Sequence, residues 1–421
     1  MAISDESEVL RRMEGKFEAM LICFILGLGS LIALNSLWTM GDYYYKLFPK
    51  RYHPLRVFTI IYQPFALSIM LILTHYESRI NTRMRNLSGY TLFFVGSLLV
   101  LVLDLATSGR GGIGPYIGLC ALCACFGIAH ASVQGGMVGD LSFMCPEFVQ
   151  SFVAGIYASG ALACALRLVT KASFEKSDNG LRNGALLSFA ISTFFEFLCI
   201  VLYAIYFPKL SIVKYYRSKA ASEGSKTVSA DLAAAGIPNG TNQQVGFDAN
   251  QQERLSNKQL FLQNIDYAVD LFLTAVITLS IIPGFLYEDT GSHKLGTWYQ
   301  LVLITMYNVM DLTSSYIPLI KCLKLESRKG LLIAALSRLL LVPAFYFTAK
   351  YGEQGWMIFL VSFLGLTNGY LTVCVYTVVP KGYKGPEQNA LGNLLALWLS
   401  SGICAGVALD WLWLIGKSEN F

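Results

Sequence analysis

Apolar runs about as long as a membrane is thick recur along almost the whole chain. A transmembrane helix needs about 20 consecutive, predominantly apolar residues. Runs of this kind can be placed at 20–42, 57–75, 88–106, 114–139, 146–166, 184–207, 265–286, 297–320, 330–349, 355–379 and 389–415. Only 14% of the residues are charged, against about 25% in ordinary soluble domains. The sequence therefore predicts an all-α polytopic membrane protein with 11 transmembrane helices.

One long polar stretch, residues 208–264, divides the runs into six and five. It is low in aromatic residues and rich in Ser, Ala, Gly, Asn and Gln, a composition that cannot bury enough apolar surface to order itself. We expect a disordered cytosolic loop there, a cytosolic tail at 1–19, a six-helix bundle at 20–207 and a five-helix bundle at 265–421. Two-bundle carriers with a site at the membrane midplane have this layout.

The charges of the loops indicate an orientation. Lys and Arg are concentrated in cytoplasmic loops of membrane proteins, and here they are more numerous in the loops that face inward if the N-terminus is cytosolic. The sequence therefore predicts a cytosolic N-terminus. The first residues, MAISDESEVLRRMEGKFEAM, are acidic and lead into a run too long for a signal peptide, so no cleaved signal is expected.

Several other classes of protein have no support in the sequence. The 10 cysteines lie mostly inside apolar runs, where cysteine acts as a small packing residue, and no His/Cys spacing of the zinc kind accompanies them. No HExxH or GxSxG motif occurs, and repeated pore loops of a channel are not visible. We therefore expect no catalytic residues, no metal, no cofactor and no nucleic-acid partner.

Polar and aromatic side chains share a helix face in the first and fourth runs. Leu31, Asn35 and Trp38 are spaced at i, i+4 and i+7; the amide and indole can bind a flat heterocycle, or they can join two helices and lie in the interfacial belt. Gln134 can pair with a base edge or with another helix. His130, one turn earlier, is a candidate proton sensor or a neutral packing residue.

The eighth run contains a carboxylate, Asp311, that would cost about 2.5 to 3.5 kcal/mol at the centre of a bilayer. Asn308, Asp311 and Ser315 share one face, and the carboxylate could accept hydrogen bonds from both hydroxyls of a ribose. It could instead form a buried ion pair with Arg338, the one cation deep within a predicted span. Arg338 needs a partner, and the candidates are the substrate, Asp311, Glu196 and Asp104.

Five stretches together resemble the equilibrative nucleoside transporter family, and the plant-type members most. They are LGLGSLIALN, VQGGMVG, LRLVTKASF, the pair YNVMDL and SRLLLVPAFY, and LTNGYLTVCVYTVVPK, in family order from about residue 20 to the end. The resemblance implies a major-facilitator-like fold, an outward C-terminus and alternating access around a nucleoside. It also implies base binding by Gln134, ribose binding by Asp311, a wall formed by Leu31, Asn35 and Trp38, and a structural or gating role for Arg338.

Two positions depart from the family pattern. Many members read Pro-Trp-Asn in the first helix, where this chain has Ala33, Leu34 and Asn35, so we expect Trp38 to replace the usual tryptophan one turn later. Many members also have an arginine four residues after the eighth-helix aspartate, and this chain has Ser315. A neighbouring guanidinium keeps a carboxylate ionised. Without it Asp311 could exchange protons during transport, which predicts a proton symporter.

The sequence thus predicts a transporter of purine and pyrimidine nucleosides such as adenosine and uridine, located in the lipid bilayer of the plasma membrane. The alternative is a facilitator-type carrier of another small polar solute, such as a sugar or a nucleobase. Sugar carriers also use amides to bind hydroxyls, but they do not need Gln134 and Asp311 together at these positions. Competition between nucleosides and hexoses in uptake would distinguish the two.

Overall fold

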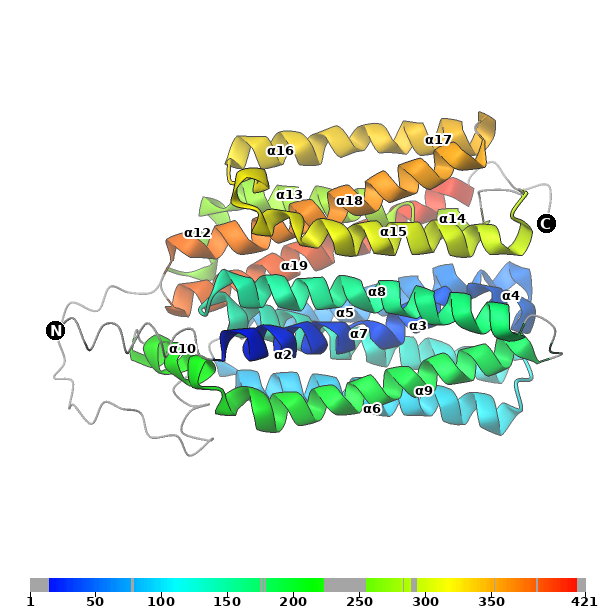
Figure 1. Ribbon diagram of the computed structural model, residues 1–421, viewed down its shortest axis with the longest axis horizontal. Coiled ribbons are helices and arrows are strands. Elements are labelled where there is room, and N and C mark those ends of the chain that lie inside the picture. The colour runs from blue at the N-terminus through cyan, green and yellow to red at the C-terminus, as the bar shows by residue number, and fades with distance from the viewer. Residues whose placement is uncertain are drawn as a thin grey trace.

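The described part of the chain is entirely helical in its regular structure. The computed structural model describes residues 15–76, 79–174, 177, 179–222, 255–282, 284–288, 294–351, 353–383 and 385–414. Long helices run side by side along the long axis of the molecule, and the described residues contain no strand (Figure 1). The predicted all-α class is confirmed.

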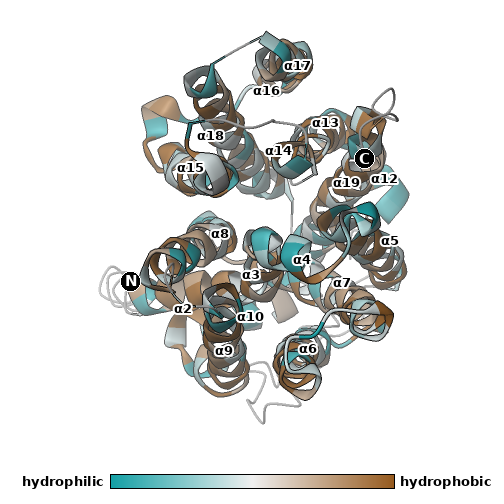
Figure 2. Ribbon diagram, turned by 90° about the vertical axis from the view of Figure 1, so that its right-hand side faces the viewer, coloured by the Kyte–Doolittle hydropathy of each residue, from teal (hydrophilic) through white to brown (hydrophobic). Residues whose placement is uncertain are grey.

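The helices of the two halves of the chain meet around the middle of the molecule. Those of the first half are α2 (Lys16–Gly29), α3 (Ile32–Thr39), α4 (Gly41–Leu47), α5 (Pro54–His75), α6 (Thr82–Thr107), α7 (Ile113–Ser142), α8 (Pro146–Phe174) and α9 (Gly180–Val201). Those of the second half are α13 (Ile265–Leu279), α14 (Gly284–Glu288), α15 (Tyr299–Ser315), α16 (Arg328–Ser337), α17 (Leu341–Tyr351), α18 (Gln354–Val378) and α19 (Gly385–Asp410). Two seams join the halves: α8 packs against α15 and α18, and α19 packs against α5 and α7 (Figure 2).

The helices have the length and composition of membrane spans. Within the described residues, 9 helices are long and apolar enough to cross a membrane, and the count is up to 10 if the bent pair α2 and α3 is one span. Helix α15, which covers most of the predicted eighth run, has 17 residues. Large apolar side chains are exposed along the outer faces, for example Leu105, Phe194 and Phe359. Exposed apolar surface on this scale fits a protein surrounded by lipid.

The first predicted span differs from a single straight helix. Helices α2 and α3 meet at an angle of 44°. The break has a local cause, because Ser30 Oγ donates to Gly27 O at 2.6 Å and Leu31 has the non-helical dihedrals φ −137° and ψ −1°. A Cβ at Gly27 would overlap the backbone of Phe152, so this glycine lets α2 lie directly against α8. The bend directs the start of α3 toward the centre of the molecule.

The ends of the predicted disordered loop, 208–264, also differ from the expectation. Residues 211–222 form helix α10 (Ser211–Ser222), and residues 257–263 form helix α12 (Asn257–Gln263). Helix α12 begins with a capping box in which Ser256 and Gln259 exchange hydrogen bonds. Helix α10 is tied to the first half by Arg217, which pairs with Asp140 at 2.6 Å. The middle of the loop, 223–254, lies outside the described residues.

Candidate functional site

A central cavity of about 150 Å³ lies between the two halves of the chain. Its wall includes residues of α3, α5, α7 and α8 from the first half and of α13, α15, α18 and α19 from the second half. Seven of the nine side chains that the sequence singles out line it: Leu31, Asn35, Trp38, His130, Gln134, Asn308 and Asp311. Ser315 and Arg338 are not part of this wall.

The broken first helix brings Leu31, Asn35 and Trp38 to the cavity together. Asn35 Nδ2 donates to Ser159 Oγ at 2.6 Å, so its amide also joins α3 to α8. Trp38 lies at the cavity wall, and the hydroxyl of Tyr287 donates to its backbone oxygen at 3.1 Å. Asn35 therefore joins two helices and also lines the cavity, and Trp38 lies inside the molecule instead of in an interfacial belt.

Buried polar atoms without a well-formed hydrogen bond surround the cavity. Within the described part of the chain they include Trp38 Nε1, Tyr62 OH, His130 Nδ1, Gln134 Oε1 and Tyr376 OH. Buried polar groups in proteins are nearly always paired, and each unpaired one calls for an explanation. Donors and acceptors that face a cavity fit a polar ligand that completes their hydrogen bonds. Their indole, imidazole, amide and phenol groups suit a planar heterocycle.

Small residues on two neighbouring helices hold Asn308 and Asp311 in place. A Cβ at Gly160 of α8 would overlap the amide of Asn308, and a Cβ at Gly365 or Gly369 of α18 would overlap the backbone of α15. Helix α15 therefore lies in close contact with both neighbours, and its polar face turns to the cavity. Ser315, on the next turn, points elsewhere: its hydroxyl donates to Leu312 O at 2.7 Å.

Arg338 has no carboxylate within 4.0 Å among the described residues. Its guanidinium donates to Thr274 O at 2.9 Å, to Thr278 Oγ1 at 2.8 Å and to Leu364 O at 3.3 Å. Of its candidate partners, Asp104 pairs with Arg182 at 2.8 Å, and both oxygens of Glu196 are buried without a hydrogen bond. Arg338 opens the 3₁₀ turn Arg338–Leu340 between α16 and α17, where Pro343 removes a helical hydrogen bond.

Several polar residues of the cavity wall were not predicted from the sequence, and two of them are linked to Asp311 by hydrogen bonds. Asn368 on α18 and Thr278 on α13 both line the cavity. Asn368 Nδ2 donates to Asp311 Oδ1 at 3.1 Å, and Thr278 Oγ1 donates to Asn368 Oδ1 at 2.9 Å. The only sequence signal was the asparagine in LTNGY, a stretch that carries the family resemblance without indicating which helix it faces.

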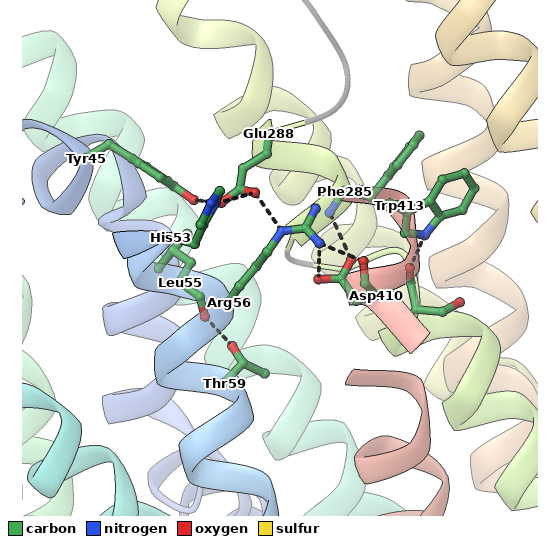
Figure 3. Close-up of polar contacts among 10 residues, drawn as sticks. Tyr45, His53, Leu55, Arg56, Thr59, Phe285, Glu288, Asp410 and Trp413 are labelled. Atoms are coloured by element: carbon green, nitrogen blue, oxygen red, sulfur yellow. Dashed lines mark hydrogen bonds and ion pairs between the residues drawn. The ribbon is translucent and has the colours of Figure 1, made fainter. Parts of the chain in front are cut away.

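A second polar site, which we call the Arg56 cluster, joins the two halves at the end of the molecule that contains α4 and α14. It consists of Tyr45, His53, Arg56, Glu288 and Asp410 (Figure 3). Arg56 donates from Nε to Glu288 Oε2 at 2.6 Å and lies 3.2 Å from Asp410 Oδ2. Tyr45 and His53 contact the same Glu288 carboxylate at 2.5 and 3.2 Å. Residues of α4 and α5 thus meet residues from the ends of α14 and α19.

The chain is similar to known transporters over its whole length. A family model described as "Nucleoside transporter" matches residues 120–415. Equilibrative nucleotide transporter 3 of Arabidopsis thaliana is 65% identical over 421 residues, with 100% of both chains covered. Equilibrative nucleotide transporter 6 of the same plant is 62% identical over 421 residues, again with 100% of both covered.

Solved structures show the same fold at low sequence identity. The major facilitator superfamily proton:xylose symporter XylE, bound to 6-bromo-6-deoxy-D-glucose, aligns with a TM-score of 0.63 and 14% identity over 95% of this chain and 88% of that chain. A bacterial homologue of the iron transporter ferroportin, in an outward-facing state with soaked iron, aligns with a TM-score of 0.55 and 14% identity over 94% and 91%. The predicted major-facilitator-like fold is confirmed. The chain therefore belongs to the plant-type equilibrative nucleoside transporters, and it is a membrane transporter and not an enzyme.

Proposed function

We propose that the protein carries nucleosides by alternating access and binds them in the central cavity. The observation that carries the proposal is the wall of this cavity, where Gln134 and Trp38 of one half face Asp311 of the other. The amide and indole suit a purine or pyrimidine, and the carboxylate suits the two hydroxyls of a ribose. A ligand held between the halves favours the closed arrangement, as alternating access requires.

The charge of the wall favours a neutral nucleoside over a nucleotide. The relatives are named nucleotide transporters, but the wall as described contains no Lys or Arg and one carboxylate, Asp311. A phosphate monoester carries about −1.5 to −2 charges at pH 7. Beside Asp311, and without a cation in the wall, such a group would be repelled and poorly solvated.

The topology belongs to the same proposal. The nine long helices, the bent first pair and α15 together make 11 spans, six before the loop at 208–264 and five after it. Helix α2 begins at one end of the molecule and α19 finishes at the opposite end (Figure 1), which supports an odd number of spans. With the N-terminus in the cytosol, the C-terminus and the Arg56 cluster face outward, and we propose the plasma membrane as the location.

Proton coupling is the finer part of the proposal. Ser315 occupies the position where many family members have an arginine, and no cation of the described chain contacts Asp311 directly. An aspartate without a direct guanidinium partner can take up a proton on one side of the membrane and release it on the other. In this scheme Asp311 binds a proton and the ribose in one transport cycle.

Uptake of labelled adenosine into cells that lack their own nucleoside transport tests the proposal. Wild type, Asp311→Asn and Gln134→Ala are compared in acidic and neutral medium, with Asp266→Asn as the control because that carboxylate lies outside the cavity wall. We expect uptake by wild type and control only, with accumulation in acidic medium that a protonophore abolishes. Uptake that does not depend on the proton gradient would reject proton coupling and indicate facilitated diffusion of the nucleoside.

Competition decides the substrate class. Excess unlabelled uridine should suppress adenosine uptake, whereas adenosine monophosphate and hexoses should not. Suppression by hexoses, or no adenosine uptake by protein that reaches the cell surface, would reject the nucleoside proposal in favour of a carrier for another small solute. Suppression by the monophosphate would reject only the preference for a neutral substrate.

A further inference from the structure

We propose that Asn368 and Thr278 are positioning residues that connect Asp311 to Arg338 and thereby orient its carboxylate for the sugar of the substrate. The inference rests on the proposed function, because it takes Asp311 as the group that meets the ribose hydroxyls. It assigns a role to two cavity residues and explains how Arg338 acts on a site that it does not touch.

The connection is a continuous chain of hydrogen bonds across four helical segments. Arg338 NH2 donates to Thr278 Oγ1 at 2.8 Å, Thr278 Oγ1 donates to Asn368 Oδ1 at 2.9 Å, and Asn368 Nδ2 donates to Asp311 Oδ1 at 3.1 Å. The four residues come from the turn after α16, from α13, from α18 and from α15. A shift of any of these segments would break a link.

The charged groups at the two ends determine the direction of the first and last bonds of the chain. A guanidinium can only donate, so Thr278 accepts from Arg338. The single proton of the Thr278 hydroxyl has two acceptors at 2.9 Å, Asn368 Oδ1 and the backbone oxygen of Thr274. An ionised carboxylate can only accept, so Asn368 must present its NH₂ group to Asp311 and its oxygen to Thr278. The opposite amide orientation would place two oxygens together at the carboxylate. When the Thr278 hydroxyl donates to Asn368, all donors of the chain are directed toward Asp311.

Burial makes this arrangement important. Arg338 is 2% exposed, Thr278 1% and Asp311 3%. Neither the guanidinium nor the carboxylate is therefore solvated by bulk water, and leaving either charge without a partner would destabilise the protein. Asn368 and Thr278 line the cavity whereas Arg338 lies behind them. The two neutral side chains thus keep the guanidinium away from the substrate while they pass its polarisation to the carboxylate.

The chain also leaves the carboxylate able to bind a ligand. Asn368 bonds Oδ1, and an ionised carboxylate has acceptor capacity for about four hydrogen bonds. A direct bidentate arginine would occupy both oxygens. With an amide in place of a guanidinium, Asp311 is held in one orientation and can still accept hydrogen bonds from two sugar hydroxyls.

The test compares a ligand that has ribose hydroxyls with one that lacks them. Inhibition constants of unlabelled adenosine and 2′,3′-dideoxyadenosine are measured against uptake of labelled uridine for wild type, Thr278→Val and Asn368→Leu. Thr278→Val keeps the shape and removes the hydroxyl. We expect the affinity for adenosine to fall about tenfold, whereas the affinity for the dideoxy analogue changes less than about twofold.

Two further variants on α13 serve as controls. Thr278→Ser keeps a hydroxyl and should preserve the affinity for adenosine. Thr274→Val removes a hydroxyl one turn away that is buried without a hydrogen bond, so it should leave the ratio of the two inhibition constants unchanged. If a variant reaches the membrane without measurable uptake, the shift in melting temperature of the purified full-length variant with each nucleoside replaces the inhibition constant.

The outcomes separate this inference from the proposed function. Equal losses for both ligands would overturn the positioning role and leave Asn368 and Thr278 as packing residues. Wild type that binds adenosine and the dideoxy analogue equally well would instead reject the contact between Asp311 and the ribose. A preference for adenosine that persists undiminished in both variants would show that Asp311 is oriented without the chain.

Discussion

Single residues determine how closely α15 approaches its neighbours. Gly160, Gly365 and Gly369 lie where any side chain would enter the space of Asn308 or the backbone beside Asp311. Small residues allow such close approach between membrane helices. The orientation of the polar face of α15 therefore depends on the absence of side chains at these glycines as well as on the side chains of α15 itself.

Gly369→Ala tests this dependence. The new methyl group would overlap Asp311 O, Ser314 Oγ and Asp311 Oδ1, and overpacking typically costs about 1–3 kcal/mol. We expect a lower melting temperature in detergent and loss of nucleoside uptake. Gly355→Ala on the same helix is the matched control, because no atom lies within 4 Å of its Cβ position and alanine favours a helix. A Gly369→Ala variant with the uptake and the melting temperature of wild type would contradict this dependence on close helix packing.

The sequence identifies candidate site residues when their chemistry conflicts with their surroundings. Asn35, Gln134 and Asp311 stand out because amides and carboxylates are costly in an apolar helix. The sequence does not identify Asn368 and Thr278, because their proposed role depends on which neighbouring helix each of them faces. The separation of Arg338 from Asp311 by two neutral side chains is likewise a matter of tertiary packing, which no spacing along one helix can reveal.

Short elements at the ends of the long helices depend on ion pairs for their position. Helix α4 follows the bent first pair, and its Asp42 accepts from Arg167 at 2.5 Å and from Lys171 at 3.2 Å, both on α8. Arg167 is fully buried. This pairing explains why LRLVTKASF contains two cations four residues apart, a pattern that the sequence alone did not connect to GDYY in the first span.

Asp42→Ala should destabilise the protein by leaving the Arg167 guanidinium buried and unpaired. Breaking a buried pair by removing one partner costs about 3–5 kcal/mol, and a value at the lower end is expected because the Asp42 side chain is 28% exposed. The double variant Asp42→Asn with Arg167→Met removes both charges and should recover part of the melting temperature. A double variant that melts below Asp42→Ala would refute a charge-based explanation.

The boundaries of elements were less predictable than their existence. The apolar runs indicate where helices lie, but the break at Leu31 arises from a serine that bonds its own helix backbone and from α2 lying against Phe152. Helices α10 and α12 occupy the ends of a stretch whose composition alone indicates disorder. Composition reports how much apolar surface a segment can bury, and it does not report the packing partner that Arg217 finds in Asp140.

For the whole molecule, the proposed alternating-access cycle requires contacts between the two halves to break and form again. The Arg56 cluster is such a contact, because Arg56 of α5 is shared between Glu288 and Asp410 of the second half. It lies outside the cavity wall. Opening the cavity toward that end would separate these groups, so the cluster stabilises the arrangement in which that end is closed.

Glu288→Gln should therefore change the rate of the transport cycle more than the binding of substrate. The neutral amide keeps the shape but weakens the attraction to Arg56, whose pairing with Asp410 remains. We expect the maximal rate of adenosine uptake to change several-fold and the KM to stay within about twofold, since catalytic-cycle and binding effects separate in this way when a group does not touch substrate.

The matched control is Lys381→Gln, which removes an exposed pair with Glu326 at 3.0 Å. Exposed pairs contribute little, so both constants should remain close to wild type. If Glu288→Gln instead raises the KM with an unchanged maximal rate, the cluster acts on the cavity and not on closure. If both variants behave like wild type, the contact between the halves does not limit transport, and the slow step of the cycle lies elsewhere.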